Sequence, residues 1–233
     1  MTSPVTMPAK IIIQDLCRLK LGWDEEVPPE HGSKWNIWLK ELSELDTFKV
    51  PRCIKPPNFG NIVSSQLHHF SDASQSAYGT VSYLRHVNEI GKIHCKFLFS
   101  KARLSPLKQI SIPRLELAAA ALSVRVNKIL KSELDITVDD VKYWTDSMTV
   151  LRYITAKTPN DFTHLLLTVL PTLEMIPVQA NGIMLIANPI LQTTFQEGCP
   201  SNRFCPVYVG YRGWISSTDL NVNGLVKGKR LGW

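Results

Sequence analysis

The segment Leu67–Arg85, LHHFSDASQSAYGTVSYLR, contains two extended runs joined by a short polar turn. The first run starts one residue before this segment, at Gln66, and leads into the turn at Ser71 to Ser74. The second run, Tyr78 to Leu84, alternates apolar and polar side chains as a strand does, and Lys92 to Lys101 alternates in the same way. The pattern predicts three consecutive antiparallel strands.

A helical pattern follows these strands. Ser111 offers an N-cap, and Pro113 occupies the first turn of an alanine-rich helix that extends to about Lys131. Val138 to Thr145 is predicted as a fourth, short strand, and Ser147 to Ala156 as a second helix. The predicted fold class is therefore α/β, with a mixed sheet and the order β-β-β-α-β-α. The face of the first helix predicted to be buried consists of Leu115, Ala118, Ala119, Leu122, Val126 and Ile129.

The remaining chain divides around this unit. Two apolar stripes at helical spacing, Ala9 to Leu21 and Trp35 to Leu45, predict a small helical segment at the N-terminus. A proline-rich stretch without periodicity predicts a linker after it, and apolar runs interrupted by prolines predict an irregular tail at the other end. The predicted division is a helical segment at 1–50, a linker at 51–65, an incomplete domain at 66–158 and a tail at 159–233.

Composition limits the environment of the protein. The formal net charge of +6 and the pI of about 9.1 favour anionic partners. No apolar run approaches the roughly 20 residues of a membrane span, and the N-terminal MTSPVTMPAK lacks a signal pattern. The five scattered cysteines lack paired spacing, which predicts buried free thiols in a reducing compartment. We therefore expect an intracellular protein of the cytoplasm or nucleus, neither secreted nor bound to a membrane.

Three carboxylates stand where the predicted elements could converge. Asp72 ends the first strand, Glu116 lies in the first turn of the alanine-rich helix, and Asp146 ends the fourth strand. The first and fourth strands of such a sheet can be adjacent and parallel, with the helix packed across them. A carboxylate cluster requires cations, and its oxygen ligands suit two Mg²⁺ or Mn²⁺ ions that promote phosphodiester cleavage. Each residue alone also fits a turn, a helix-dipole contact or an N-cap.

Three blocks occur in this order: LHHFSDASQSAYGTVSYLR, KARLSPLKQISIPRLELAAAAL and VKYWTDSMTVLRYI. They closely resemble the ribonuclease H segment of Pao/BEL-type retrotransposon polyproteins. The upstream LCRLKLGWDEEVP, W-x-x-WL and VPRC resemble the region that follows the polymerase, or reverse transcriptase, in the same polyproteins. The resemblance covers roughly residues 8 to 158. It implies that Asp72, Glu116 and Asp146 are catalytic residues that bind two metal ions, with Asp72 bridging both, and that the substrate is the RNA strand of an RNA–DNA hybrid.

The sequence also departs from the full polyprotein. The catalytic aspartates of the polymerase are absent, so the chain is not expected to synthesise DNA. This family region is also labelled a retrotransposon peptidase, but the chain has no Asp-Thr/Ser-Gly loop of an aspartic protease. Binding to the hybrid is expected to rest on phosphate contacts, with Lys101, Arg103 and Lys108 as the candidate residues.

The tail holds a family pattern in another reading frame. Relatives continue after the RYI block with RFHTFVANRV and end in NPADDVSRG, which supplies a fourth catalytic aspartate. When each codon is rebuilt from the last base of one residue's codon and the first two of the next, Asn160 to Gly198 can encode a matching sequence. The fourth aspartate falls at the junction of Gln192 and Thr193. This predicts a frame change near Thr158 to Asn160 that removes the fifth strand, the final helix and that aspartate.

Three functional hypotheses follow. The leading one is a retrotransposon-derived ribonuclease H-type endonuclease whose activity is impaired by the lost aspartate. The second is a non-catalytic fragment that binds RNA–DNA hybrid or other segments of the polyprotein. The third, a polynucleotidyl transferase of the integrase kind, shares the carboxylate chemistry, but the position of Glu116 early on the first helix favours ribonuclease H.

Overall fold

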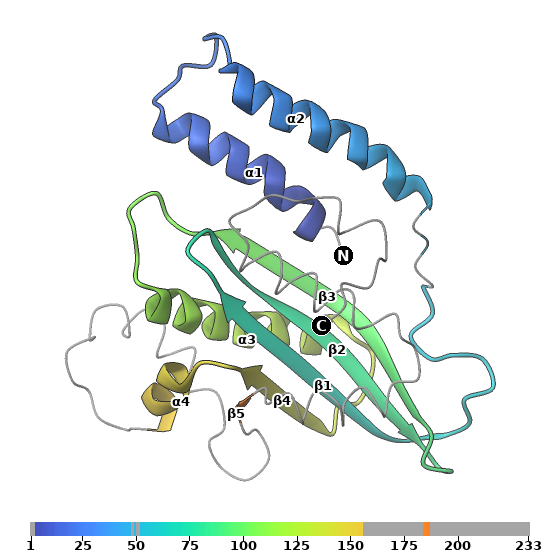
Figure 1. Ribbon diagram of the computed structural model, residues 1–233. Coiled ribbons are helices and arrows are strands. Elements are labelled where there is room, and N and C mark those ends of the chain that lie inside the picture. Colours follow the sequence, from blue (N-terminus) through green and yellow to red (C-terminus); the bar gives the residue numbers. More distant parts are fainter. Residues whose placement is uncertain (1–2, 48, 50–51, 156–183, 187–233) are drawn as a thin grey trace, which may run out of the picture.

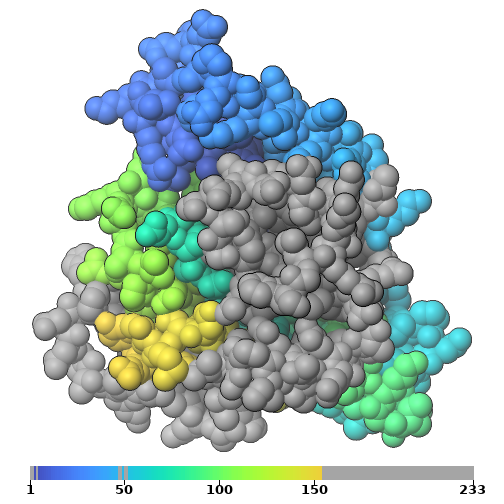
Figure 2. All heavy atoms as spheres, viewed as in Figure 1, coloured from blue at the N-terminus to red at the C-terminus, as the bar shows by residue number. Residues whose placement is uncertain are grey.

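The computed structural model describes residues 3–47, 49, 52–155 and 184–186. A mixed sheet forms the centre of the molecule, α3 covers one face of it, α1 lies beside β3, and α2 packs on α1 (Figure 1). The two N-terminal helices form one end of the molecule (Figure 2). The elements are α1 (Ser3–Arg18), α2 (Pro29–Leu42), the 3-10 helix η1 (Ser43–Thr47), β1 (Ile62–Ala73), β2 (Ala77–Asn88), β3 (Ile93–Leu104), α3 (Ile112–Glu133), β4 (Asp140–Thr145), α4 (Met148–Thr155) and β5 (Met184–Ile186).

The sheet has the order β3-β2-β1-β4-β5, and the predicted β-β-β-α-β-α order of the first elements is confirmed. β1, β2 and β3 pair as an antiparallel meander. In the turn between β2 and β3, Asn88 Oδ1 accepts the backbone N–H groups of Ile90 and Lys92, and Gly91 has a φ of +77°. The α3 crossover then returns the chain so that β4 pairs with β1 in parallel.

Helix α3 forms the core by packing across β1, β2 and β4. Its buried side spans more than one row of side chains, because the helix contacts both the sheet and α4. Near its N-terminal half, one cluster joins Leu117, Ala120, Val124, Tyr143 and Val150. Further along, a second cluster joins Leu67, Leu84, Val126 and Leu130.

The buried face predicted for α3 is wrong at two positions. Ile129 is 48% exposed, while its neighbour Leu130 is only 8% exposed and belongs to the core. Ala118 is half-buried, although Ala119 is fully buried. A period of 3.6 residues leaves several rows available as the inner one, and Leu130 is the buried residue because it packs against Leu67 and Leu84 of the sheet.

The N-terminal segment forms a helical pair, as its two apolar stripes predicted. α1 begins at Ser3 instead of Ala9, and it includes Pro8, whose missing N–H removes one helical hydrogen bond without ending the helix. Trp38 of α2 donates a hydrogen bond from Nε1 to the carbonyl oxygen of Val5 at 2.8 Å. This contact joins the two helices.

The boundaries of the predicted linker and tail differ from the observed elements. β1 begins at Ile62, inside the segment 51–65. Phe59 in the same segment is 2% exposed, and its carbonyl accepts a hydrogen bond from Asn88 Nδ2 at 2.6 Å. Within the predicted tail, 159–233, the described residues 184–186 form β5, which pairs in parallel with β4 where the frame change was expected to leave no strand. The rest of that tail lies outside the described residues.

The cysteines differ from the predicted buried free thiols. Cys17 and Cys53 are free, but both are exposed, the first on the outer side of α1 and the second in the loop before β1. Cys95 is buried but disulfide-bonded. Among the described residues, no helix combines the length and the apolar character that crossing a membrane requires.

Candidate active site

Asp72 and Asp146 lie at the carboxyl ends of two adjacent parallel strands. The last paired residues are Phe70 of β1 and Trp144 of β4, so each aspartate stands two residues beyond the same level of the sheet. Neighbouring strands run about 4.8 Å apart, and residues two apart on a strand share a face. The register therefore brings the two aspartates to the same end of neighbouring strands.

Aromatic contacts fix the two strands just before the aspartates. Trp144 Nε1 donates to His68 Nδ1 at 3.0 Å, and the Phe70 and Trp144 rings stack with centroids 5.6 Å apart. Burial lowers the pKa of His68 to about 3, so its ring stays neutral and can accept this hydrogen bond. These contacts hold β1 and β4 in one register at the level that precedes the carboxylates.

Glu116 reaches the same end of the sheet from α3. It lies in the second turn of the helix, and not in the first as predicted, because α3 begins at Ile112. Its Oε2 accepts a hydrogen bond from the Ser147 hydroxyl at 2.5 Å. Since Ser147 directly follows Asp146, the contact joins α3 to the junction between β4 and α4. Ser147 was predicted only as the start of a helix, although its place directly after Asp146 at the end of a strand was a signal in the sequence.

Each aspartate could instead have a structural role, Asp72 in the turn after β1 and Asp146 as the N-cap of α4. In that turn, Asp72 Oδ1 accepts the backbone N–H of Ala73 at 2.8 Å, and the Ser74 hydroxyl oxygen accepts the backbone N–H groups of Ser76 and Ala77, both at 3.2 Å. At the start of α4, the Ser147 hydroxyl oxygen accepts the Val150 N–H at 3.2 Å, so the N-cap is Ser147.

The side chains of Asp72, Glu116 and Asp146 are not arranged as a metal site in the structure. Over the described ranges, no three His, Cys, Asp or Glu side chains are grouped so that they could hold an ion. The Glu116 carboxylate is directed to Ser147. The fold thus brings the segments that carry Asp72, Glu116 and Asp146 to one end of the sheet, while their role as metal ligands stays a prediction.

The three basic residues predicted to contact phosphates lie along one segment. Lys101 and Arg103 belong to β3, where they pair with Thr80 and Tyr78 of β2, and Lys108 lies in the loop before α3. Arg103 and Lys108 are exposed and Lys101 is half-buried. Their side chains are accessible at the β3 side of the sheet, and their contact with nucleic acid stays a prediction.

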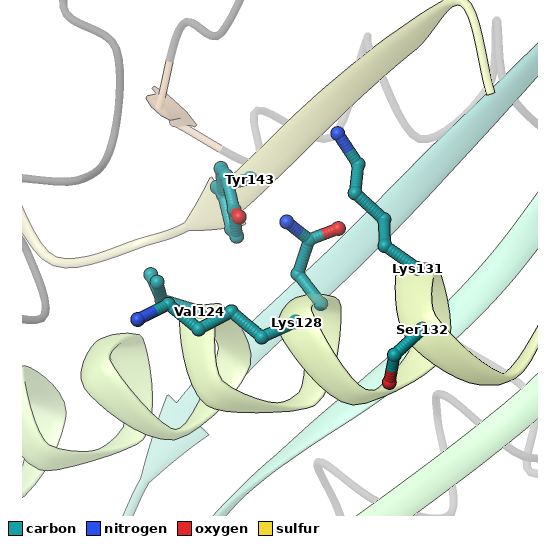
Figure 3. A pocket seen from close by; sticks show the side chains of 6 residues that line it. Val124, Lys128, Lys131, Ser132 and Tyr143 are labelled. Carbon is teal, nitrogen blue, oxygen red and sulfur yellow. The ribbon is translucent and has the colours of Figure 1, made fainter.

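A hollow of about 430 Å³ lies between α3 and β4, and none of the residues that line it was predicted as part of a site (Figure 3). Asn127 on its wall shares a hydrogen bond of 3.2 Å with His69 Nε2. Burial raises the pKa of the Tyr143 phenol above its ordinary value, so the phenol stays protonated. Val124, the lining residue of α3 nearest to Glu116 in sequence, follows it by eight residues, or about 12 Å along the helix, and Tyr143 precedes Asp146 by three residues. Its lining residues are Val124, Asn127, Lys128, Lys131, Ser132 and Tyr143.

Several solved structures are similar to the chain at low sequence identity. Ribonuclease H1 from the halophilic archaeon Halobacterium salinarum NRC-1 is 14% identical, with 52% of this chain and 85% of that chain covered and a TM-score of 0.34. LC11-RNase H1 in complex with RNA/DNA hybrid is 10% identical, with coverages of 53% and 84% and a TM-score of 0.32. The foamy viral protease-reverse transcriptase in complex with dsDNA is 14% identical, with coverages of 80% and 34% and a TM-score of 0.44.

The sequence itself identifies the family. Comparison with curated proteins finds no match. The family model described as the Pao retrotransposon-like RNaseH-like domain matches residues 1–147. The match spans more than half of the 233 residues and includes the helical pair, the first four strands of the sheet, α3 and all three carboxylates. The chain therefore belongs to the Pao retrotransposon-like RNaseH-like domain family.

Proposed function

We propose that this protein is a ribonuclease H-type endonuclease domain that acts on the RNA strand of RNA–DNA hybrids. The observation that carries the proposal is the register of β1 and β4, which brings Asp72 and Asp146 to the carboxyl ends of two neighbouring parallel strands. Glu116 is tied to the same junction through Ser147. Family membership supports the choice of a ribonuclease H-like activity among the reactions that carboxylate sites perform.

The three carboxylates fit Mg²⁺ or Mn²⁺ as a donor set, because hard divalent cations prefer oxygen ligands. Two such ions, when bound, activate a water molecule and stabilise the leaving oxygen in phosphodiester hydrolysis. Asp72 is the residue proposed to bridge both ions. Its backbone pairs with Gly79 of β2, so its position in the sheet is fixed. Glu116 and Asp146 would complete the site from α3 and from the end of β4.

Phosphate contacts would hold the substrate. The net charge of +6 favours a polyanion, and Lys101, Arg103 and Lys108 offer cationic groups near β3. The motifs include no element that reads base edges, so binding is proposed to follow the shape and charge of the hybrid.

The proposal includes impaired activity, because the amino-acid sequence lacks the family's final NPADDVSRG block with its fourth aspartate. A frame change near Thr158 to Asn160 would account for that loss, and the junction of Gln192 and Thr193 would hold the missing codon. The nucleotide sequence around residues 155 to 165 tests this directly. An uninterrupted frame there that has no relation to RFHTFVANRV would remove the explanation.

The activity is tested with a hybrid whose RNA strand is labelled. Asp72→Asn and Asp146→Asn are expected to reduce Mg²⁺-dependent cleavage at least about a hundredfold, since each removes a charged ligand from a site that depends on the ions. Asp135→Asn is the matched control, because Asp135 is an exposed carboxylate in the loop between α3 and β4. Equal cleavage by the wild type and all three variants would show that Asp72 and Asp146 do not belong to the active site.

A second candidate is a non-catalytic module that binds RNA–DNA hybrid or another segment of the polyprotein. The lack of a grouped set of metal-ligating side chains in the described part of the chain favours it. Titration with Mn²⁺ separates the two functions. Binding of the hybrid with no measurable affinity for Mn²⁺ would support the module, whereas saturable Mn²⁺ binding that depends on Asp72 would support the nuclease.

A further inference from the structure

Ser147 makes hydrogen bonds in two directions from one buried hydroxyl group. The residue is 7% exposed, and its hydroxyl donates to Glu116 Oε2 at 2.5 Å. The same oxygen accepts the N–H of Val150 at 3.2 Å, and the Ser147 carbonyl accepts the N–H of Leu151 at 3.2 Å. Ser147 is therefore the N-cap of α4 and at the same time a partner of a carboxylate on α3.

The two roles of this hydroxyl use different parts of the group. A serine hydroxyl has one proton and two acceptor lone pairs. The cap uses a lone pair, and the bond to Glu116 uses the only proton. Because this bond occupies Oε2, the second oxygen of the carboxylate remains a separate acceptor that an ion could use.

The surrounding core makes the contact geometrically stable. Leu117, the residue after Glu116, and Val150, whose N–H bonds to Ser147, belong to the same buried cluster. Leu117 is 2% exposed and Val150 is fully buried. The backbones that carry the donor and the acceptor are thus held by close packing, so the hydrogen bond can fix the direction of the Glu116 side chain.

We propose that Ser147 is a positioning residue that orients the Glu116 carboxylate toward a divalent cation at the end of β4. This inference rests on the proposed function, because it assumes that Glu116 is a metal ligand. Hydrogen-bonded partners of metal ligands typically contribute about 10- to 100-fold to metal affinity. Loss of the Ser147 hydroxyl is therefore expected to weaken binding of Mn²⁺ by at least about tenfold.

The experiment measures Mn²⁺ binding to the full chain by electron paramagnetic resonance, without nucleic acid. Ser147→Gly removes the hydroxyl but keeps a good N-cap residue, so α4 is retained at a cost of only a few tenths of a kcal/mol. Ser147→Thr keeps the hydroxyl and is expected to bind within about threefold of the wild type. In a Glu116→Gln background, Ser147→Gly is expected to have no further effect, because the two changes remove one interaction. Circular dichroism of each variant verifies that it is folded.

The outcomes separate the inference from the proposed function. A normal Mn²⁺ affinity in Ser147→Gly, together with weak binding in Glu116→Gln and Asp72→Asn, would overturn the positioning role and leave the metal site intact. Weakened binding in Ser147→Gly that is equally large in the Glu116→Gln background would also overturn it, since Ser147 would then act independently of Glu116. No Mn²⁺ binding by the wild-type chain would overturn both.

Discussion

His69 lies in the middle of β1 with both ring nitrogens hydrogen-bonded inside the core. Nδ1 pairs with Ser82 Oγ at 2.7 Å, and Nε2 pairs with Asn127 Oδ1 at 3.2 Å. Asn127 accepts, so Nε2 carries the proton and Ser82 donates to Nδ1. Burial lowers the pKa of His69 to about 4, since a charged ring there would lose its hydration. The neutral histidine thus links β1, β2 and α3.

Acidification is expected to destabilise the fold through His68 and His69. The unfolded chain protonates each ring as the pH falls through about 6.5, while the folded chain keeps them neutral down to about 3 for His68 and about 4 for His69. The unfolded state binds more protons in this window, so the free energy of unfolding falls with pH, by about 2 kcal/mol per histidine at pH 5. Urea unfolding at pH 7 and pH 5 measures the difference.

Two variants test the assignment of this pH dependence. His69→Gln is expected to lower stability at pH 7 but to reduce the pH dependence. His68→Gln is expected to reduce the pH dependence as well, since burial also lowers the pKa of His68. Identical urea midpoints for the wild type at the two pH values would contradict the role of the buried histidines.

Predictability from sequence differs among the elements. The strands β1 to β4 follow from alternation and turn residues, because side chains on a strand alternate between its two faces with a fixed period of two. The row of α3 that faces inward could not be chosen from the sequence, since Ile129 and Leu130 are both apolar and only packing against the sheet decides between them. The start of β1 at Ile62 was hidden by the neighbouring prolines, which give no periodic signal.

The candidate site was partly predictable from the same local strand pattern. Asp72 and Asp146 could be assigned to strand ends from the local pattern, and the parallel pairing of β1 with β4 follows from the usual crossover. The hydrogen bond between Ser147 and Glu116 could not be foreseen, because it joins residues that are 31 positions apart and depends on how α3 and α4 pack.

Two neighbouring substitutions that shorten a side chain test the observed orientation of α3. Leu130→Ala removes a side chain that is 8% exposed and packed with Leu67 and Val126, so it is expected to lower the free energy of unfolding by about 2–5 kcal/mol. Ile129→Ala removes one that is 48% exposed, and its effect is expected to stay below about 1 kcal/mol. Chemical denaturation measures both. The reverse order of the two effects would show that the predicted face, with Ile129 inside, is the correct one.

At the scale of the whole molecule, the positive charge should govern binding to nucleic acid. Affinity for an RNA–DNA hybrid is expected to fall linearly on a plot of log affinity against log salt concentration, because each phosphate contact releases counterions. Replacing both Lys101 and Arg103 with Gln is expected to reduce the slope by about two, roughly one for each lost contact. Lys20→Gln combined with Lys40→Gln is the control for net charge, since it also removes two charges and both lysines are exposed and lie outside the sheet. If the Lys101 and Arg103 double variant and the control reduce the slope equally, a defined phosphate contact at β3 is excluded.

Helix α1 packs against β3, and this contact limits where the chain can be shortened for expression. The Ser3 hydroxyl donates to the carbonyl of Ser100 at 3.1 Å, and Gln14 Nε2 donates to the carbonyl of Ser105 at 2.6 Å. β3 is the edge strand of the sheet, and exposed edges of this kind promote pairing between molecules. A shortened protein that starts at the proline-rich segment would lose this cover and would be prone to aggregate. Expression trials of the ribonuclease H-like part should therefore retain the chain from its first helix onward.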